Sequence, residues 1–129
     1  MKRIIETIKI YLSAIYTLTS SYAVVGNLKT VIDKDGLYSV LYKGQVRFSA
    51  ASDDCYTAIM VNGVIIDVVY HLNNASTVVL NAPYMMYIPK IKLKAGDIVS
   101  IQAKYSDAGG EIYYEANVRT PFLAIIKEG

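Results

Sequence analysis

The residues of this sequence best suited to catalysis are its only histidine, His71, and its only cysteine, Cys55. A nucleophile triad needs a base, but His71 lies near the end of an apolar run with no nucleophile signature beside it. Cys55 follows Asp53 and Asp54, and neighbouring carboxylates disfavour the thiolate that a cysteine nucleophile requires. We therefore predict no catalytic residue, and an enzymatic function would have to depend on His71.

Four aspartates, Asp33, Asp35, Asp53 and Asp54, offer the oxygen ligands that calcium prefers. No loop has the full spacing of a calcium-binding hand, so solvated turn carboxylates are the better interpretation. Asn74-Ala75-Ser76 matches a glycosylation acceptor, which has meaning only in a secreted protein. Because the sequence also lacks a metal-binding Cys/His cluster and a phosphate-binding glycine loop, we predict no metal and no cofactor.

The composition favours a single domain that binds or assembles. The 129 residues include 13 basic and 11 acidic side chains, and the net charge of +2 is too balanced for binding to nucleic acid. Hydrophobic residues make up 53% of the chain and the mean hydropathy is +0.31, so we expect part of the apolar surface to lie against another subunit. Twelve tyrosines without a tryptophan are typical of strands and contact surfaces.

One segment is the best candidate for such a contact. Tyr84-Met85-Met86-Tyr87 lies between Pro83 and Pro89, and proline cannot donate a ladder hydrogen bond, so the segment belongs at a sheet edge or in a crossing loop. Its four large side chains could form an exposed patch or a subunit interface. An edge strand packed into its own core is an equally good interpretation.

We expect the first 27 residues to form an amino-terminal anchor or assembly segment, followed by a domain over residues 28–129. The even positions from Ile8 to Leu18 are apolar and alternate with mostly polar residues, which favours a strand. The same stretch also allows a helix with an apolar seam that packs on copies of itself. The residues of that seam are Ile4, Ile8, Tyr11, Ile15 and Leu18.

The amino-terminal segment also has features of a secretory leader, namely a basic start, an apolar run and Ser21-Tyr22-Ala23 as a cleavage site. Glu6 and Lys9 interrupt the apolar run, so we expect the segment to be retained. The uncharged stretch from Ile10 to Val25 is shorter than about 20 residues and rich in hydroxyl groups, which argues against a membrane span.

From residue 28 onward, short β-rich runs alternate with turns, and we find no helical period. Asn62-Gly63 predicts a type I′ hairpin, and we expect Gly36 to take a positive φ in the turn that it ends. Asp97 should accept hydrogen bonds from nearby backbone donors. About eight to ten strands predict an antiparallel sandwich, jelly roll or small barrel. The segment 37–51 forms one strand or two that are divided at Gly44. The other expected strands, besides the edge segment 84–88, are 28–32, 56–61, 64–72, 77–80, 98–105, 112–118 and 122–126.

Three separated pieces resemble one family, the complement globular-head and tumour-necrosis-factor-like jelly rolls with their bacterial and phage relatives. They are Asp35-Gly36-Leu37-Tyr38-Ser39-Val40, the strand and hairpin of residues 56–63, and the strand pair of residues 91–101, which contains Leu93-Lys94-Ala95-Gly96-Asp97-Ile98-Val99. Residues 120–126 are placed like the family's closing strand. The resemblance implies a ten-strand jelly roll, a trimer with apolar and aromatic residues at its threefold axis, and no catalytic residues.

No collagen-like Gly-x-x repeat is present, and a short anchor joined directly to a jelly roll resembles a phage virion protein. We therefore expect a non-enzymatic structural protein of a bacteriophage virion, either a capsid auxiliary or decoration protein or a head-fibre component. It would form a homotrimer that docks on larger capsid or fibre proteins, with no nucleic-acid or membrane partner. The alternative is a cell-surface or secreted module that binds a carbohydrate or a protein receptor. The expected interface residues are Ile8, Ile10, Leu12, Tyr84, Met85, Met86, Tyr87 and Phe122.

Overall fold

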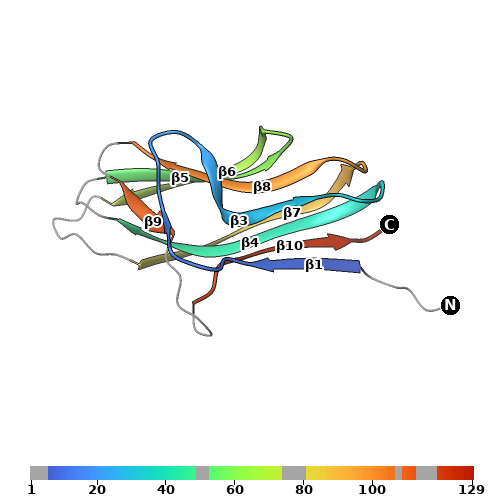
Figure 1. Ribbon diagram of the computed structural model, residues 1–129, viewed down its shortest axis with the longest axis horizontal. Helices are drawn as coiled ribbons and strands as arrows, with labels where there is room; N and C mark the ends of the chain where they lie inside the picture. The colour runs from blue at the N-terminus through green and yellow to red at the C-terminus, as the bar shows by residue number, and fades with distance from the viewer. Residues whose placement is uncertain (1–5, 49–52, 74–80, 107–108, 113–118) are drawn as a thin grey trace.

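The computed structural model (Figure 1) describes residues 6–48, 53–73, 81–106, 109–112 and 119–129. These residues form ten β-strands and no helix. The expected strand 77–80, the glycosylation acceptor, and parts of the expected strands 37–51 and 112–118 lie outside the described residues. The strands are β1 (Glu6–Tyr11), β2 (Tyr16–Thr17), β3 (Ala23–Val31), β4 (Gly36–Phe48), β5 (Asp53–Val61), β6 (Val64–Asn73), β7 (Asn81–Leu93), β8 (Ile98–Tyr105), β9 (Gly110–Ile112) and β10 (Phe122–Lys127).

The strands form two antiparallel sheets that pack as the two layers of a sandwich (Figure 1). In sheet A, β7, β4, β10 and β1 lie side by side in that order. Near its C-terminal end, β4 pairs with β9 on the side where its earlier residues pair with β10. Strand β2 then pairs with the other side of β9. Sheet B has the order β3-β8-β5-β6. The predicted all-β antiparallel jelly-roll sandwich is thus confirmed.

The core lies between the two sheets and follows the period-2 alternation of the strands. In β4, Tyr38, Val40, Tyr42, Val46 and Phe48 all point into it and are at most 3% exposed. Gly44 therefore does not break this strand, although its position made a break plausible from the sequence. Because these five side chains stand opposite sheet B, the intervening residues face the other side of sheet A, where Ser39 and Gln45 are nevertheless buried.

The amino-terminal residues belong to the sandwich. Residues 6–11 pair with β10 in an unbroken antiparallel register from Glu6 and Lys127 to Tyr11 and Phe122. The strand interpretation is therefore confirmed for these residues, and the helical alternative is wrong for them. The expected boundary at residue 28 falls inside β3, because the described part of the anchor segment contributes strands to both sheets.

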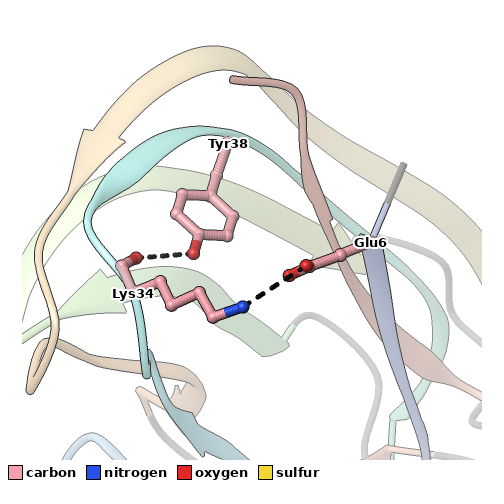
Figure 2. A network of polar contacts seen from close by, with 3 residues as sticks. All are labelled: Glu6, Lys34 and Tyr38. Carbon is pink, nitrogen blue, oxygen red and sulfur yellow. Dashed lines mark hydrogen bonds and ion pairs between the residues drawn. The ribbon is translucent and has the colours of Figure 1, made fainter. Parts of the chain in front are cut away.

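The first residue of β1 is held beside the turn that joins β3 to β4 (Figure 2). Lys34 Nζ lies 3.6 Å from Glu6 Oε1, and the Tyr38 hydroxyl donates to the Lys34 carbonyl at 2.7 Å. Burial, followed by the charges of nearby carboxylates, raises the pKa of Tyr38, so the phenol stays protonated and continues to donate. The ion pair is exposed and contributes little, whereas the buried tyrosine anchors the turn.

Two turn predictions have different outcomes. Asn62 and Gly63 have φ angles of 53° and 78°, as a type I′ turn requires, so that hairpin is confirmed. Gly36 does not have a positive φ, so its predicted role is wrong. A Cβ at Gly36 would lie 2.6 Å from the carbonyl oxygen of Gly129, so this glycine is needed for the close approach of two backbones.

The edge segment between the two prolines is also confirmed. Strand β7 contains both Pro83 and Pro89 and, within the described residues, hydrogen-bonds only to β4. Proline is tolerated there because one side of an edge strand makes no ladder. In the described ranges we find no helix with the length and hydropathy needed to cross a membrane.

Candidate interaction surface

The face of sheet A that points away from sheet B carries an aromatic and aliphatic surface. The register places Tyr11 opposite Phe122, Phe122 opposite Lys43, and Lys43 opposite Met85. A second row, one step along the strands, joins Lys9, Ala124, Leu41 and Tyr87. These residues alternate with core residues along their strands, so they share the outer face. We define the sheet A patch as Tyr11, Leu41, Met85, Tyr87 and Phe122.

The patch is exposed in the single chain. Met85 is 64% exposed and Tyr87 is 51% exposed, whereas Phe122 is half-buried. Lys9 lies across the aromatic pair, with Nζ 4.3 Å from the Phe122 ring centroid and 5.0 Å from that of Tyr11. The Lys9 ammonium thus adds a positive charge over the rings of an otherwise apolar surface.

The expected interface residues divide between surface and core. Met85, Tyr87 and Phe122 come together in the sheet A patch, although β4 separates β7 from β10. Leu12 and Met86 are each 2% exposed within the core, and Ile10 and Tyr84 pack against it. Ile8 is exposed, but its position in β1 turns it toward the side occupied by the core. The candidate surface therefore does not include these five residues.

The interface residues expected from the sequence did not include Tyr11 or Leu41. Tyr11 was assigned to the polar positions of an alternating strand, and only its pairing with Phe122 shows that those positions share a face with aromatic residues. Its ring lies 5.9 Å from that of Phe122 at 56°. If Tyr11 is counted as an apolar side chain, the sequence itself indicates that the outer face of this strand is partly apolar.

A second exposed apolar surface, also missed, lies on β6 at the edge of sheet B. Within the described residues this strand pairs only with β5. Its hairpin end carries Val64, Ile65, Ile66 and Val68, of which Val64 is 62% exposed. We call these four residues the β6 patch. A long apolar edge strand without a partner is a site where another chain tends to pair.

The best candidate for catalysis, His71, is part of a buried polar cluster that joins the two sheets. The Tyr84 hydroxyl donates to Thr57 Oγ1 at 2.7 Å, and Thr57 Oγ1 lies 3.4 Å from His71 Nε2. The Tyr84 hydroxyl also lies 3.4 Å from that of Tyr42. Burial lowers the pKa of His71 to about 4 and raises the pKa of both tyrosines. The imidazole is therefore neutral at pH 7. It is also only 7% exposed, and both properties suit a structural role.

The other candidate groups also have structural partners. Cys55 is buried, and Asp35 Oδ1 accepts a hydrogen bond from the backbone of Ala95 at 2.8 Å. Asp54 Oδ2 accepts one from the Tyr70 hydroxyl at 2.9 Å. Among the described residues, no group of three or more His, Cys, Asp or Glu side chains could hold a metal ion.

No protein-family model matches the sequence, and no curated protein matches it. Among solved structures, murine APRIL is similar over 95% of this chain and 98% of its own, with a TM-score of 0.63 and 15% identity. Eiger TNF from S. frugiperda is similar over 95% of this chain and 85% of its own, with a TM-score of 0.53 and 11% identity. Dimeric latent PorU from Porphyromonas gingivalis has a TM-score of 0.63 and 9% identity; the match covers 95% of this chain but only 12% of PorU.

At these identities the comparisons establish the fold. Both APRIL and Eiger TNF are matched over most of their length, so this chain has a tumour-necrosis-factor-like jelly-roll fold. That confirms the fold which the three sequence pieces implied. The candidate site is a pair of exposed apolar surfaces on such a jelly roll, and its chemistry is that of contact with another molecule.

Proposed function

We propose that this protein is a non-enzymatic assembly module that forms a homotrimer and serves as a structural component of a bacteriophage virion. The observation that carries the proposal is the presence of two separate apolar surfaces, the sheet A patch and the β6 patch. A ring of three identical subunits has heterologous contacts, so each subunit must present two different surfaces that fit each other. The chain presents two such surfaces on different sheets.

The chemistry of the two surfaces is complementary. The β6 patch is aliphatic and projects from a sheet edge, whereas the sheet A patch is a broad face of aromatic rings and Met85. Burial of apolar surface contributes about 25 cal/mol for each Å² removed from water, before ordering costs are deducted. A stable contact needs roughly 800 Å² from each partner, so the contact would extend beyond the two patches into their polar rim.

The trimer is tested by the mass of the purified protein. Light scattering at micromolar concentration should give three times the chain mass. Replacement of both Met85 and Tyr87 by lysine should give a folded monomer, because it places two charges in the contact. Val31→Lys is a matched control, since Val31 is an equally exposed apolar residue on β3, outside both patches. A stable folded wild-type monomer would contradict the proposal.

The virion role rests on the resemblance to phage jelly rolls and on the capacity for assembly. Mass spectrometry of particles purified from the native source should detect the chain, and electron microscopy should show its trimers on a capsid or fibre. If the chain were found only outside particles, the virion role would be wrong, while the trimer could still stand.

The alternative is a secreted or cell-surface recognition module. Cleavage after Ala23 would remove β1 and β2, and with them the strand that pairs along the whole of β10. Leu12 and Leu18, both core residues, would be lost as well. We therefore expect the native protein to keep these residues, and a mature terminus at Val24 would instead support the alternative.

A further inference from the structure

A row of tyrosines crosses the outer face of sheet B. Lys104 pairs with Tyr56 across β8 and β5, and Tyr56 pairs with Tyr70 across β5 and β6. Tyr22 directly precedes β3 and extends the row on the other side of Lys104, whose Nζ lies 5.1 Å from the Tyr22 ring centroid. The outward direction follows from Cys55, which is next to Tyr56 and is buried in the core.

The side chains of this row hold one another in place. The rings of Tyr56 and Tyr70 contact each other with centroids 5.0 Å apart at 46°. Lys104 Nζ lies 5.2 Å from the Tyr56 ring centroid as well, so the cation is shared by two rings. The Tyr70 hydroxyl donates to Asp54 at 2.9 Å, while the residue remains 51% exposed. The row is thus an ordered surface that needs little rearrangement to bind.

The chemistry of the row fits a sugar chain. Tyr70 is exposed, and Tyr22 and Tyr56 are partly exposed. A tyrosine offers a flat apolar face and a polar tip, and a sugar ring likewise has an apolar face of C–H groups and an edge of hydroxyls. The Lys104 ammonium can donate hydrogen bonds to sugar hydroxyls, and each tyrosine hydroxyl can donate to them or accept from them. With strands about 4.8 Å apart, the four-strand row spans roughly 14 Å, which is longer than one sugar ring.

Two other occupants fit less well. A proline-rich helix inserts between aromatic walls, but the rings of Tyr56 and Tyr70 touch and leave no slot between them. A single-stranded nucleic acid stacks on aromatic residues but needs a positively charged groove for its phosphates. Here one lysine is balanced by the carboxylate of Asp54 at the end of the row.

We propose that Tyr22, Tyr56, Tyr70 and Lys104 form a binding platform for a neutral oligosaccharide or polysaccharide chain. The platform lies on sheet B and faces away from the sheet A patch. Its Tyr70 end borders the β6 patch, since Tyr70 and Val68 are two residues apart on β6, so the proposed trimer leaves the end at Tyr22 and Lys104 exposed. The platform does not depend on the virion role, and its test reports binding where the trimer test reports mass. The two proposals can therefore fail separately.

The test uses the full chain on a printed array of neutral glycans that includes cello-, malto-, chito-, xylo- and manno-oligosaccharides, followed by calorimetric titration with the best hexasaccharide. We expect saturable binding, with Tyr56→Ala and Tyr70→Ala each weakening it about tenfold. Tyr70→Phe should keep most of the affinity, because the stacking ring remains. Val31→Ala, which shortens a similarly exposed side chain on β3 outside the row and both patches, should leave the affinity unchanged.

Circular dichroism of each variant shows whether the jelly roll is intact, and if one alanine variant does not fold, the other one alone decides the test. The proposal is overturned if no glycan on the array binds saturably, or if binding survives both alanine substitutions in folded protein. It is also overturned if a decaproline peptide or an oligothymidine binds to the row in place of the sugars.

Discussion

At the scale of single residues, the most unusual feature is a hydrogen-bonded polar cluster inside an otherwise apolar core. Tyr42 and Tyr84 come from sheet A, and Thr57 and His71 come from sheet B. The rings of His71 and Tyr84 meet edge to face with centroids 4.2 Å apart. Because every member has a partner, the cluster joins the sheets without leaving a hydroxyl or imidazole unsatisfied.

This cluster predicts a specific loss of stability in acid. The pKa of His71 is about 4 in the folded protein and 6.5 without burial, so the unfolded chain binds the proton more tightly. The stability that neutral His71 contributes is fully present above pH 6.5, and falls as the pH drops to about 4. At ~1.4 kcal/mol for each pH unit, the loss reaches about 3 kcal/mol.

Urea unfolding at a series of pH values measures this effect. His71→Phe should remove the corresponding part of the pH dependence, because phenylalanine carries no proton. The pKa of Asp97 is also lowered, first by its hydrogen bond with the backbone of Lys94. Protonation of Asp97 in acid therefore lowers the stability of the wild type and of the His71→Phe variant alike. Identical pH profiles for the two proteins between pH 4 and 6.5 would contradict the assignment.

Gly44 gives a second prediction at this scale. The Tyr42 side chain lies over the glycine, and a Cβ there would come within 2.7 Å of Tyr42 Cζ. Since Tyr42 is fully buried and hydrogen-bonded, it cannot move aside freely. Gly44→Ala should lower the free energy of unfolding by about 1–3 kcal/mol, measured by urea titration.

Tyr42→Phe provides the matched test of that mechanism. The hydroxyl is among the atoms closest to the added methyl group, so the double variant should lose less stability than the sum of the two single variants. Strict additivity would show that the cost of Gly44→Ala has another origin. Lys43→Ala, at the exposed neighbouring position, should be nearly neutral.

At the scale of elements, two turns far apart in the sequence are joined by side chains. Asp97 Oδ2 accepts from the backbone of Lys94 at 2.8 Å, as predicted for a turn aspartate. Its other oxygen accepts from Asn62 Nδ2 at 3.0 Å, and Asn62 Oδ1 in turn accepts from the backbone of Ile98 at 2.9 Å. The β5–β6 hairpin is thereby fixed to the turn between β7 and β8.

Asp97→Ala should therefore lower the midpoint of thermal unfolding, because it removes contacts to both turns. Asn62→Gly keeps the positive φ of the hairpin but loses the amide, so it should reproduce only the loss of the link between the turns. Asp67→Ala is a control, since the Asp67 carboxylate accepts a hydrogen bond from its own neighbour Val68. Calorimetry that showed equal midpoints for Asp97→Ala and wild type would contradict this account.

At the scale of the whole molecule, the two sheets present different surfaces to the outside. Sheet A carries the aromatic and aliphatic patch through which we propose assembly, and sheet B carries the tyrosine row through which we propose sugar binding. Because the β6 patch borders the tyrosine row at Tyr70, an assembled trimer keeps exposed the end of the row at Tyr22 and Lys104. The β6 patch, at the edge of sheet B, is the surface through which one subunit would reach the next.

Much of the fold was predictable because it depends on local physics. Strand β8 matches the expected range 98–105, and the Asn62-Gly63 hairpin and the edge position of the two prolines follow from backbone conformation alone. The role of Gly36 was not predictable, since the backbone that approaches it belongs to Gly129 at the far end of the chain. The candidate site was predicted only in part, as Met86 and Leu12 show, because alternation identifies two faces without saying which is covered.

The sequence by itself determined that this chain forms short antiparallel strands with tight turns, because those choices are made between neighbouring residues. Only the tertiary structure decided that Tyr11, Met85 and Phe122 share one surface, and that Tyr22, Tyr56 and Tyr70 line up on another. The reason is that both surfaces are built by strand pairing across long separations in the chain. A side chain's place on such a surface depends on the register of its neighbours, which is set when the sheets close around their core.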